Sequence, residues 1–182
     1  MYPAFAEMDR VELTLYTDAL ITRGLYRTRQ HRVTDILNRS ETPFLVLEEV
    51  TVTDIGSDAP PIRAQYAQVN LDAVLFAVAD VPVEPVPELR TPKFQQRAIV
   101  SIPPFRVVGT IHLLPTENNL REALTELTGR FIPVTDATYW ADSLKEPRRH
   151  AIALAVNHQR AQIFAQVDDE AAALGLAPEP EG

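Results

Sequence analysis

Cysteine is absent from this chain of 182 residues, and glycine occurs only 6 times. Without cysteine, the chain has no disulfide, no thiol nucleophile and no thiolate ligand for zinc. With so few glycines, it contains neither a P-loop nor a dinucleotide-binding fingerprint, because both need glycines at fixed spacing. Long apolar runs are also missing: the stretch 73–79 is far shorter than the roughly 20 residues that cross a bilayer. We therefore expect a protein with no membrane span.

The first residues lack the basic start and apolar run of a signal peptide, so we expect a cytoplasmic location. Hydrophobic residues make up 46% and charged residues 23%, as in an ordinary globular protein. The net charge is −8, from 17 basic and 25 acidic residues. An acidic total argues against a protein that binds nucleic acid mainly through its overall charge, although it permits a local basic patch.

The chain resembles itself at a nearly constant offset. Residues 67–70 match 154–157 at an offset of 87, the separation of Asn70 and Asn157. The same offset aligns 43–52 with 130–139 and 33–37 with 120–124, and an offset of 85 aligns 21–26 with 106–111. Three landmark pairs recur in order: Gly24 and Gly109, Phe44 and Phe131, Asn70 and Asn157. This pattern predicts an internal duplication. The alternative is a chance likeness between β-rich segments.

Each copy has the same pattern of elements. Alternating apolar and polar residues, as in 11–16, predict a first strand, and a glycine marks a bend in the second. A short amphipathic helix follows, at 33–37 and at 119–127. A third strand then starts at Phe44 or Phe131, which we expect to be buried, and the last two strands meet at an asparagine turn. The predicted fold is mainly β, a tandem duplication of a five-stranded, mostly antiparallel small barrel or rolled sheet with one short helix per repeat.

Composition divides the chain into five segments. Residues 1–9 form an N-terminal extension, 10–80 the first repeat and 97–167 the second repeat. Between the repeats, the proline spacing of 81–96 favours a semi-rigid linker. Residues 168–182 form an acidic tail that we expect to be partly disordered.

The order of a bent second strand and an apolar third strand resembles the Sm-like small barrels. Arg23-Gly24-Leu25 is similar to their glycine-bent strand, 44–50 to their third strand with an acidic turn, and 69–74 to their last turn. In Sm-like proteins the helix precedes the first strand, whereas here it falls between the second and third. The uridine pocket Asp-x-x-x-Asn is absent, so the resemblance implies a fold and not RNA binding. A two-copy, functionally uncharacterised bacterial family is equally suggested by the same order of landmarks.

No pattern typical of catalysis or metal binding is found. The four histidines, His31, His112, His150 and His158, lie outside any His-Glu-x-x-His motif. No serine lies in a Gly-x-Ser-x-Gly elbow, and adjacent carboxylates such as Glu48-Glu49 do not converge on a substrate. We therefore predict a non-enzymatic protein without cofactor or metal.

Two groups of residues are candidates for binding. Arg23, Arg27 and Arg29 alternate along a predicted strand, so they project from one face and could hold phosphates, a nucleic acid or an acidic partner. The alternative is a solvated face neutralised by nearby glutamates. Tyr139 and Trp140 are the best aromatic anchor for a partner, because tryptophan is enriched in interface hot spots.

The leading functional hypothesis is a binding or scaffold protein that acts through protein–protein contacts, in a homo-oligomer or a larger complex. Small β domains must cover their exposed strand edges, and pairing with a neighbour does so. Nucleic-acid binding through the arginine face is the second hypothesis. A small-molecule site between the repeats is the third.

Overall fold

A computed structural model of the chain describes residues 8–30, 32–79, 94–113, 120–125, 127–167 and 174–175. Ten strands form one sheet in the order β10-β6-β7-β8-β9-β5-β1-β2-β3-β4. All the neighbouring pairs are antiparallel. The mainly β, antiparallel fold expected from the sequence is therefore confirmed. Within these residues the sheet is open, with β10 and β4 as its outer strands, so of the two expected forms, a small barrel or a rolled sheet, it is not a closed barrel.

The elements follow one another in the expected order. The N-terminal half contains β1 (Asp9–Tyr16), β2 (Leu20–Thr28), α1 (Val33–Asn38), β3 (Phe44–Asp54), β4 (Ile62–Asn70) and β5 (Phe76–Ala79). The C-terminal half contains β6 (Phe94–Ile102), β7 (Phe105–Leu113), α2 (Leu120–Thr125), β8 (Phe131–Ala141), η2 (Asp142–Leu144), β9 (Glu146–Asn157) and β10 (Ile163–Gln166). β6 starts inside the predicted linker. Residues 81–93 of that linker, 1–7 of the extension and most of the tail lie outside the described residues.

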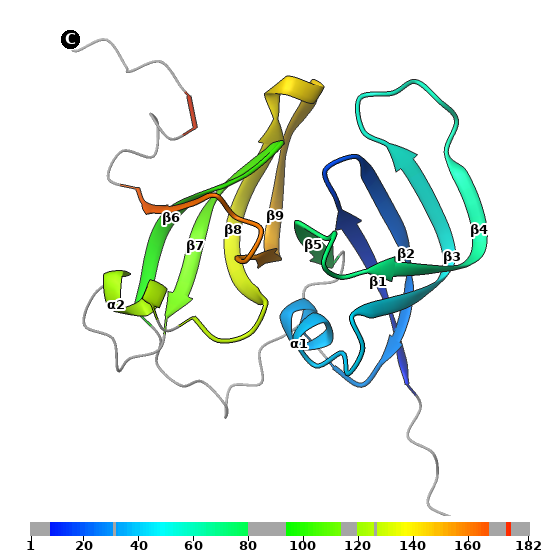
Figure 1. Ribbon diagram of the computed structural model, residues 1–182, viewed down its shortest axis with the longest axis horizontal. Coiled ribbons are helices and arrows are strands. Elements are labelled where there is room, and N and C mark those ends of the chain that lie inside the picture. The colour runs from blue at the N-terminus through cyan, green and yellow to red at the C-terminus, as the bar shows by residue number, and fades with distance from the viewer. Residues whose placement is uncertain are drawn as a thin grey trace, which may run out of the picture.

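Both halves have the same strand order, because the fifth strand of each pairs with its first. Tyr16 of β1 lies opposite Phe76 of β5, and Ser101 of β6 lies opposite Ile163 of β10. The backbone N–H of Leu75 donates to the carbonyl of Tyr16 at 2.8 Å, and that of Gln162 donates to Ser101 at 2.8 Å. In Figure 1 the halves form two lobes with β5 and α1 between them, whereas α2 lies at the outer side of its lobe.

A bulge bends the second and third strands of each half at the predicted glycines. The register shifts at Gly24 between β2 and β3, and at Gly109 between β7 and β8. The residues opposite, Glu49 and Asp136, have φ of 52° and 48°. A Cβ on Gly24 would lie 3.0 Å from the carbonyl oxygen of Glu48, and one on Gly109 would lie 2.5 Å from Cγ1 of Val134. The bulge brings the two strands so close that no side chain fits, which explains why glycine occupies both positions.

The asparagine turns also share their hydrogen bonds. The Oδ1 of Asn70 accepts from the N–H of Asp72 at 2.9 Å, and that of Asn157 accepts from Gln159 at 3.2 Å. Asparagine side chains stabilise such turns by accepting from the backbone two residues ahead. The prediction that Asn70 and Asn157 end the fourth strand of each half at a turn is confirmed.

The halves are joined by pairing between β5 and β9, which we call the junction. The backbone N–H of Asn157 donates to the carbonyl of Leu75 at 2.8 Å, and its buried Nδ2 donates to Val74 at 2.9 Å. From α1, Asn38 donates to the carbonyl of Phe131 at 2.7 Å and accepts from its N–H at 2.8 Å. These bonds satisfy polar groups that the junction removes from water.

Each half contributes side chains to the hydrophobic core of the other half. The C-terminal core contains Tyr16 and Phe76 from the N-terminal half, and the N-terminal core contains Phe131 from the C-terminal half. Tyr16 stacks on Phe76 with 4.5 Å between ring centroids, and Phe105 packs edge-on against Phe76 at 5.1 Å. Aromatic pairs in these geometries stabilise beyond their buried area. The two cores are therefore held together across the junction.

Replacing Gly109 with alanine tests the bulge. The added Cβ would meet Val134 and the backbone of β8, so we expect the free energy of unfolding to fall by about 1–3 kcal/mol. Urea denaturation measures this loss. Gly24→Ala is the matched variant and should cost less, because its closest contacts are at 3.0 Å. A Gly109→Ala protein as stable as the parent would contradict the close approach of the two strands.

Candidate functional site

The arginines of β2 form ion pairs with glutamates on the neighbouring strands. Nε of Arg23 lies 2.7 Å from Oε1 of Glu12, and Nε of Arg27 lies 3.0 Å from Oε1 of Glu48. Glu48 also accepts from Arg10 at 2.9 Å. Arg29 is exposed but lies beyond the end of β2, so the predicted three-residue stripe is shorter than expected. The geometry therefore favours a row of exposed ion pairs, each worth at most about 1 kcal/mol.

The two residues expected to anchor a partner are buried within the chain. The hydroxyl of Tyr139 lies 3.1 Å from that of Tyr16, and its ring packs 5.1 Å from Phe76. The indole N–H of Trp140 donates to Oδ2 of Asp142 at 3.1 Å. Because their rings are covered by residues of the same chain, Tyr139 and Trp140 cannot present a surface anchor. Tryptophan's frequency at interfaces did not distinguish these buried rings from exposed ones.

The three histidines that the structure describes, His112, His150 and His158, contact oxygen atoms of the protein, and His31 lies outside the described residues. Nε2 of His150 lies 2.9 Å from Oδ1 of Asp136, and Nη1 of Arg97 lies 3.4 Å from Oδ2 of Asp136. The hydrogen bond from His150 lowers the pKa of the Asp136 carboxyl, burial opposes this shift, and the charges of Arg97 and His150 lower the pKa further. His158 donates to the carbonyl of Gly129 at 2.7 Å. In the described part of the chain, no group of three His, Asp or Glu side chains could hold a metal ion.

A shallow hollow lies over β3 and β4 on the N-terminal half, lined by Glu49, Thr51, Arg63 and Gln65 among others. It is wide open to solvent and belongs to one half. It therefore does not correspond to the small-molecule site that the sequence left open between the repeats.

The outer strands are the remaining candidate site. Within the described residues, no strand pairs with the far side of β4 or of β10. β4 is nine residues long, and its exposed side chains include Ile62 and Tyr66. On β10, Ile163 is 58% exposed. Large exposed apolar side chains on an unpaired strand are typical of a place where another strand is added.

Residues at equivalent positions are buried at the junction and exposed at the outer strands. Phe131 is 1% exposed, but Phe44 is 40% exposed, so the prediction that Phe44 is buried is wrong. Phe76 is fully buried, whereas Ile163, its counterpart 87 residues on, is mostly exposed. Asn157 is buried and Asn70 is exposed. No sequence pattern distinguishes the two sets of positions, because burial depends on which strand is covered by the other half.

No family model matches the chain, and no match was found among the curated proteins or the solved structures. Among the described residues, no helix has the length and apolar character needed to cross a membrane.

Phe131 and Phe44 provide a matched test of this asymmetry. Phe131→Ala should lower the free energy of unfolding by about 3–5 kcal/mol, the usual cost of truncating a buried aromatic side chain. Phe44→Ala should cost much less at concentrations where the chain is monomeric, because Phe44 is exposed there. Chemical denaturation at low protein concentration compares the two. Equal losses would mean that Phe44 is as well packed as Phe131.

Proposed function

We propose that this protein is a non-enzymatic scaffold that binds other protein chains by adding strands to the edges of its sheet. The observation that carries the proposal is the pair of outer strands, β4 and β10, which end an open sheet with exposed apolar side chains. Unpaired backbone N–H and C=O groups along a strand form hydrogen bonds with any extended segment of suitable sequence. Natural proteins usually protect such strands with charges, prolines or bulges.

We infer that the sheet arose by tandem duplication of a five-stranded rolled unit. The bulges support this inference, since Glu49 and Asp136 share a left-handed backbone and are separated by the sequence offset of 87. The turns support it too: Leu71 donates to Pro43, and 87 residues on His158 donates to Arg130, at 2.8 and 3.1 Å. Such a unit keeps the glycine-bent second strand on which the resemblance to Sm-like barrels rests.

The nucleic-acid hypothesis receives no comparable support. Arg23 and Arg27 face carboxylates at ion-pair distance, and these would have to be displaced before a phosphate could bind. The proposal therefore rests on the strand edges rather than on the arginines.

Self-association measures the proposed function directly. We expect light scattering across micromolar concentrations to give a mass above the 20.3 kDa of one chain, rising with concentration. High salt should change this mass little, because edge pairing depends on backbone hydrogen bonds and apolar contacts rather than on exposed ion pairs. A single-chain mass throughout, together with no binding of extended peptides, would contradict the proposal.

A further inference from the structure

The strand pairing at the junction predicts how the outer strands pair with another chain. It pairs the fifth strand of one half with the fourth strand of the other. The outer strands are the remaining fourth strand, β4, and the remaining fifth strand, β10. Building on the proposed scaffold function, we propose that β10 of one copy pairs antiparallel with β4 of a second copy, in the register that β5 and β9 adopt inside the chain.

The register follows from the junction. There Phe76 lies opposite Val156, Ala77 opposite Ala155 and Val78 opposite Leu154. Adding the repeat offset of 87 to each residue number of β5 gives positions on β10, and subtracting 87 from each residue number of β9 gives positions on β4. These positions are the predicted contacts between copies. The resulting pairs are Ile163 with Val69, Phe164 with Gln68, and Ala165 with Ala67.

The residue that donates across the junction has a counterpart on β4. At the junction, the backbone and side chain of Asn157 donate to Leu75 and Val74. The counterpart of Asn157 is Asn70, which is exposed at the end of β4. Its backbone N–H and Nδ2 would donate to the carbonyls of Gln162 and Ala161 of the second copy.

Side-chain directions agree with this pairing. On β5, Phe76 and Val78 point into the core of the opposite half, while Ala77 packs in the core of its own half. On β10, Phe164 packs against its own core, so Ile163 and Ala165 point the other way. Ile163 would then lie against Ala67 and Val69, which are only partly buried at the edge of the N-terminal core.

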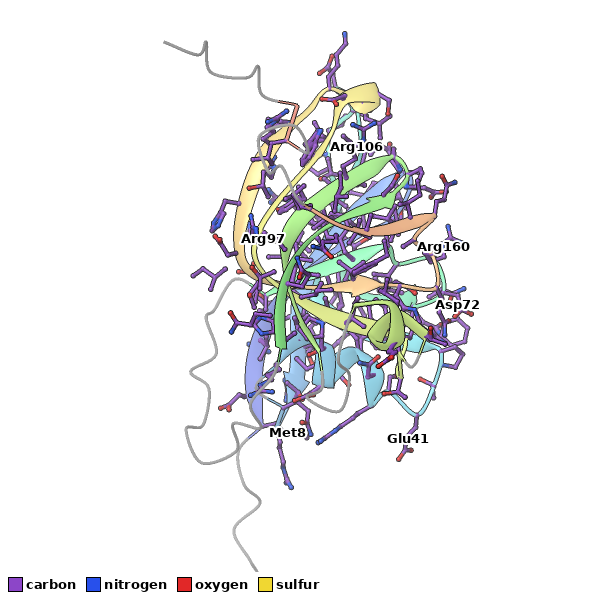
Figure 2. All side chains as sticks on the ribbon, turned by 90° about the vertical axis from the view of Figure 1, so that its left-hand side faces the viewer. Met8, Glu41, Asp72, Arg97, Arg106 and Arg160 are labelled. Carbon is purple, nitrogen blue, oxygen red and sulfur yellow. The ribbon has the colours of Figure 1, made fainter. Side chains whose placement is uncertain are left out.

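The two segments that this head-to-tail arrangement brings together differ in net charge. Residues 10–80 carry 7 basic and 10 acidic side chains and residues 97–167 carry 8 and 6, so these two segments have opposite net charge, and the five acidic side chains of 168–182 follow β10. Figure 2 labels Arg97, Arg106 and Arg160 on the C-terminal half and Glu41 and Asp72 on the N-terminal half. An interface between two different patches repeats from copy to copy and builds a closed ring or an open filament.

Disulfide trapping tests the register, and the absence of native cysteine makes it specific. Ala67→Cys and Ala165→Cys are made as separate proteins, mixed in equal amounts and oxidised. We expect a disulfide-linked dimer in the mixture and little in either protein alone. Gln68→Cys mixed with Ala165→Cys is the control and should give at least about 10-fold less dimer, because neighbouring residues of a strand face opposite sides.

Each other outcome overturns the pairing. Cross-linking of Ala67→Cys with itself would mean that β4 pairs with β4. Equal yields from the Ala67 and Gln68 mixtures would mean that the register is not fixed. No cross-link in a protein that still self-associates would reject this interface but leave the scaffold function standing, whereas a strict monomer that binds no peptide would reject both.

A second test avoids cysteine chemistry. Ile163→Asp should weaken self-association by about 10-fold or more, since the carboxylate replaces the apolar side chain that would lie against Ala67 and Val69. Ile152→Asp is the matched control, because Ile152 is 66% exposed on β9 but takes no part in the proposed pairing. Circular dichroism verifies that both variants fold. Equal effects of the two substitutions, or no effect of Ile163→Asp, would contradict the pairing.

Discussion

Pairing between β5 and β9 is the contact on which the rest of the structure depends. It joins the two five-stranded halves into one ten-stranded sheet. It also brings Tyr16, Phe76, Phe105 and Tyr139 into one aromatic cluster. Because each half places side chains in the core of the other, separating them would expose apolar surface on both sides. The same contact occupies one fourth strand and one fifth strand, so it determines which two strands remain at the edges.

The differences between the halves follow from that arrangement. Asn157 and Phe131 are buried because they lie at the junction, and their counterparts Asn70 and Phe44 are exposed because they lie on the outer side. α1 packs against β8 and β9 of the opposite half, while α2 lies on the far side of its lobe (Figure 1). Each outer strand thus has residues that resemble those used at the junction, and the proposed contact between copies requires no new type of interaction.

Short-range patterns allowed much of this fold to be predicted from the sequence. Alternation located the strands, and Gly24 and Gly109 marked the bulges because a strand so closely approached there has no room for a Cβ. Burial at Phe44 could not be predicted, since it depends on long-range packing that two matching segments do not share. The candidate site at the outer strands could not be predicted from the sequence either. The arginine stripe and Trp140 stand out by residue type, whereas an unpaired strand edge has no residue signature. Only the strand order identifies it.

Hydrogen exchange at Asn70 tests the central claim, that the junction is repeated between copies, most directly. The amide of Asn157 donates to Leu75 at the junction and should exchange slowly at every protein concentration. If β4 is covered in the same way, the amide of Asn70 exchanges quickly in dilute solution and becomes protected as the concentration rises through the range of self-association. Exchange at Asn70 that stays fast and independent of concentration, while the protein self-associates and Asn157 remains protected, would contradict the account.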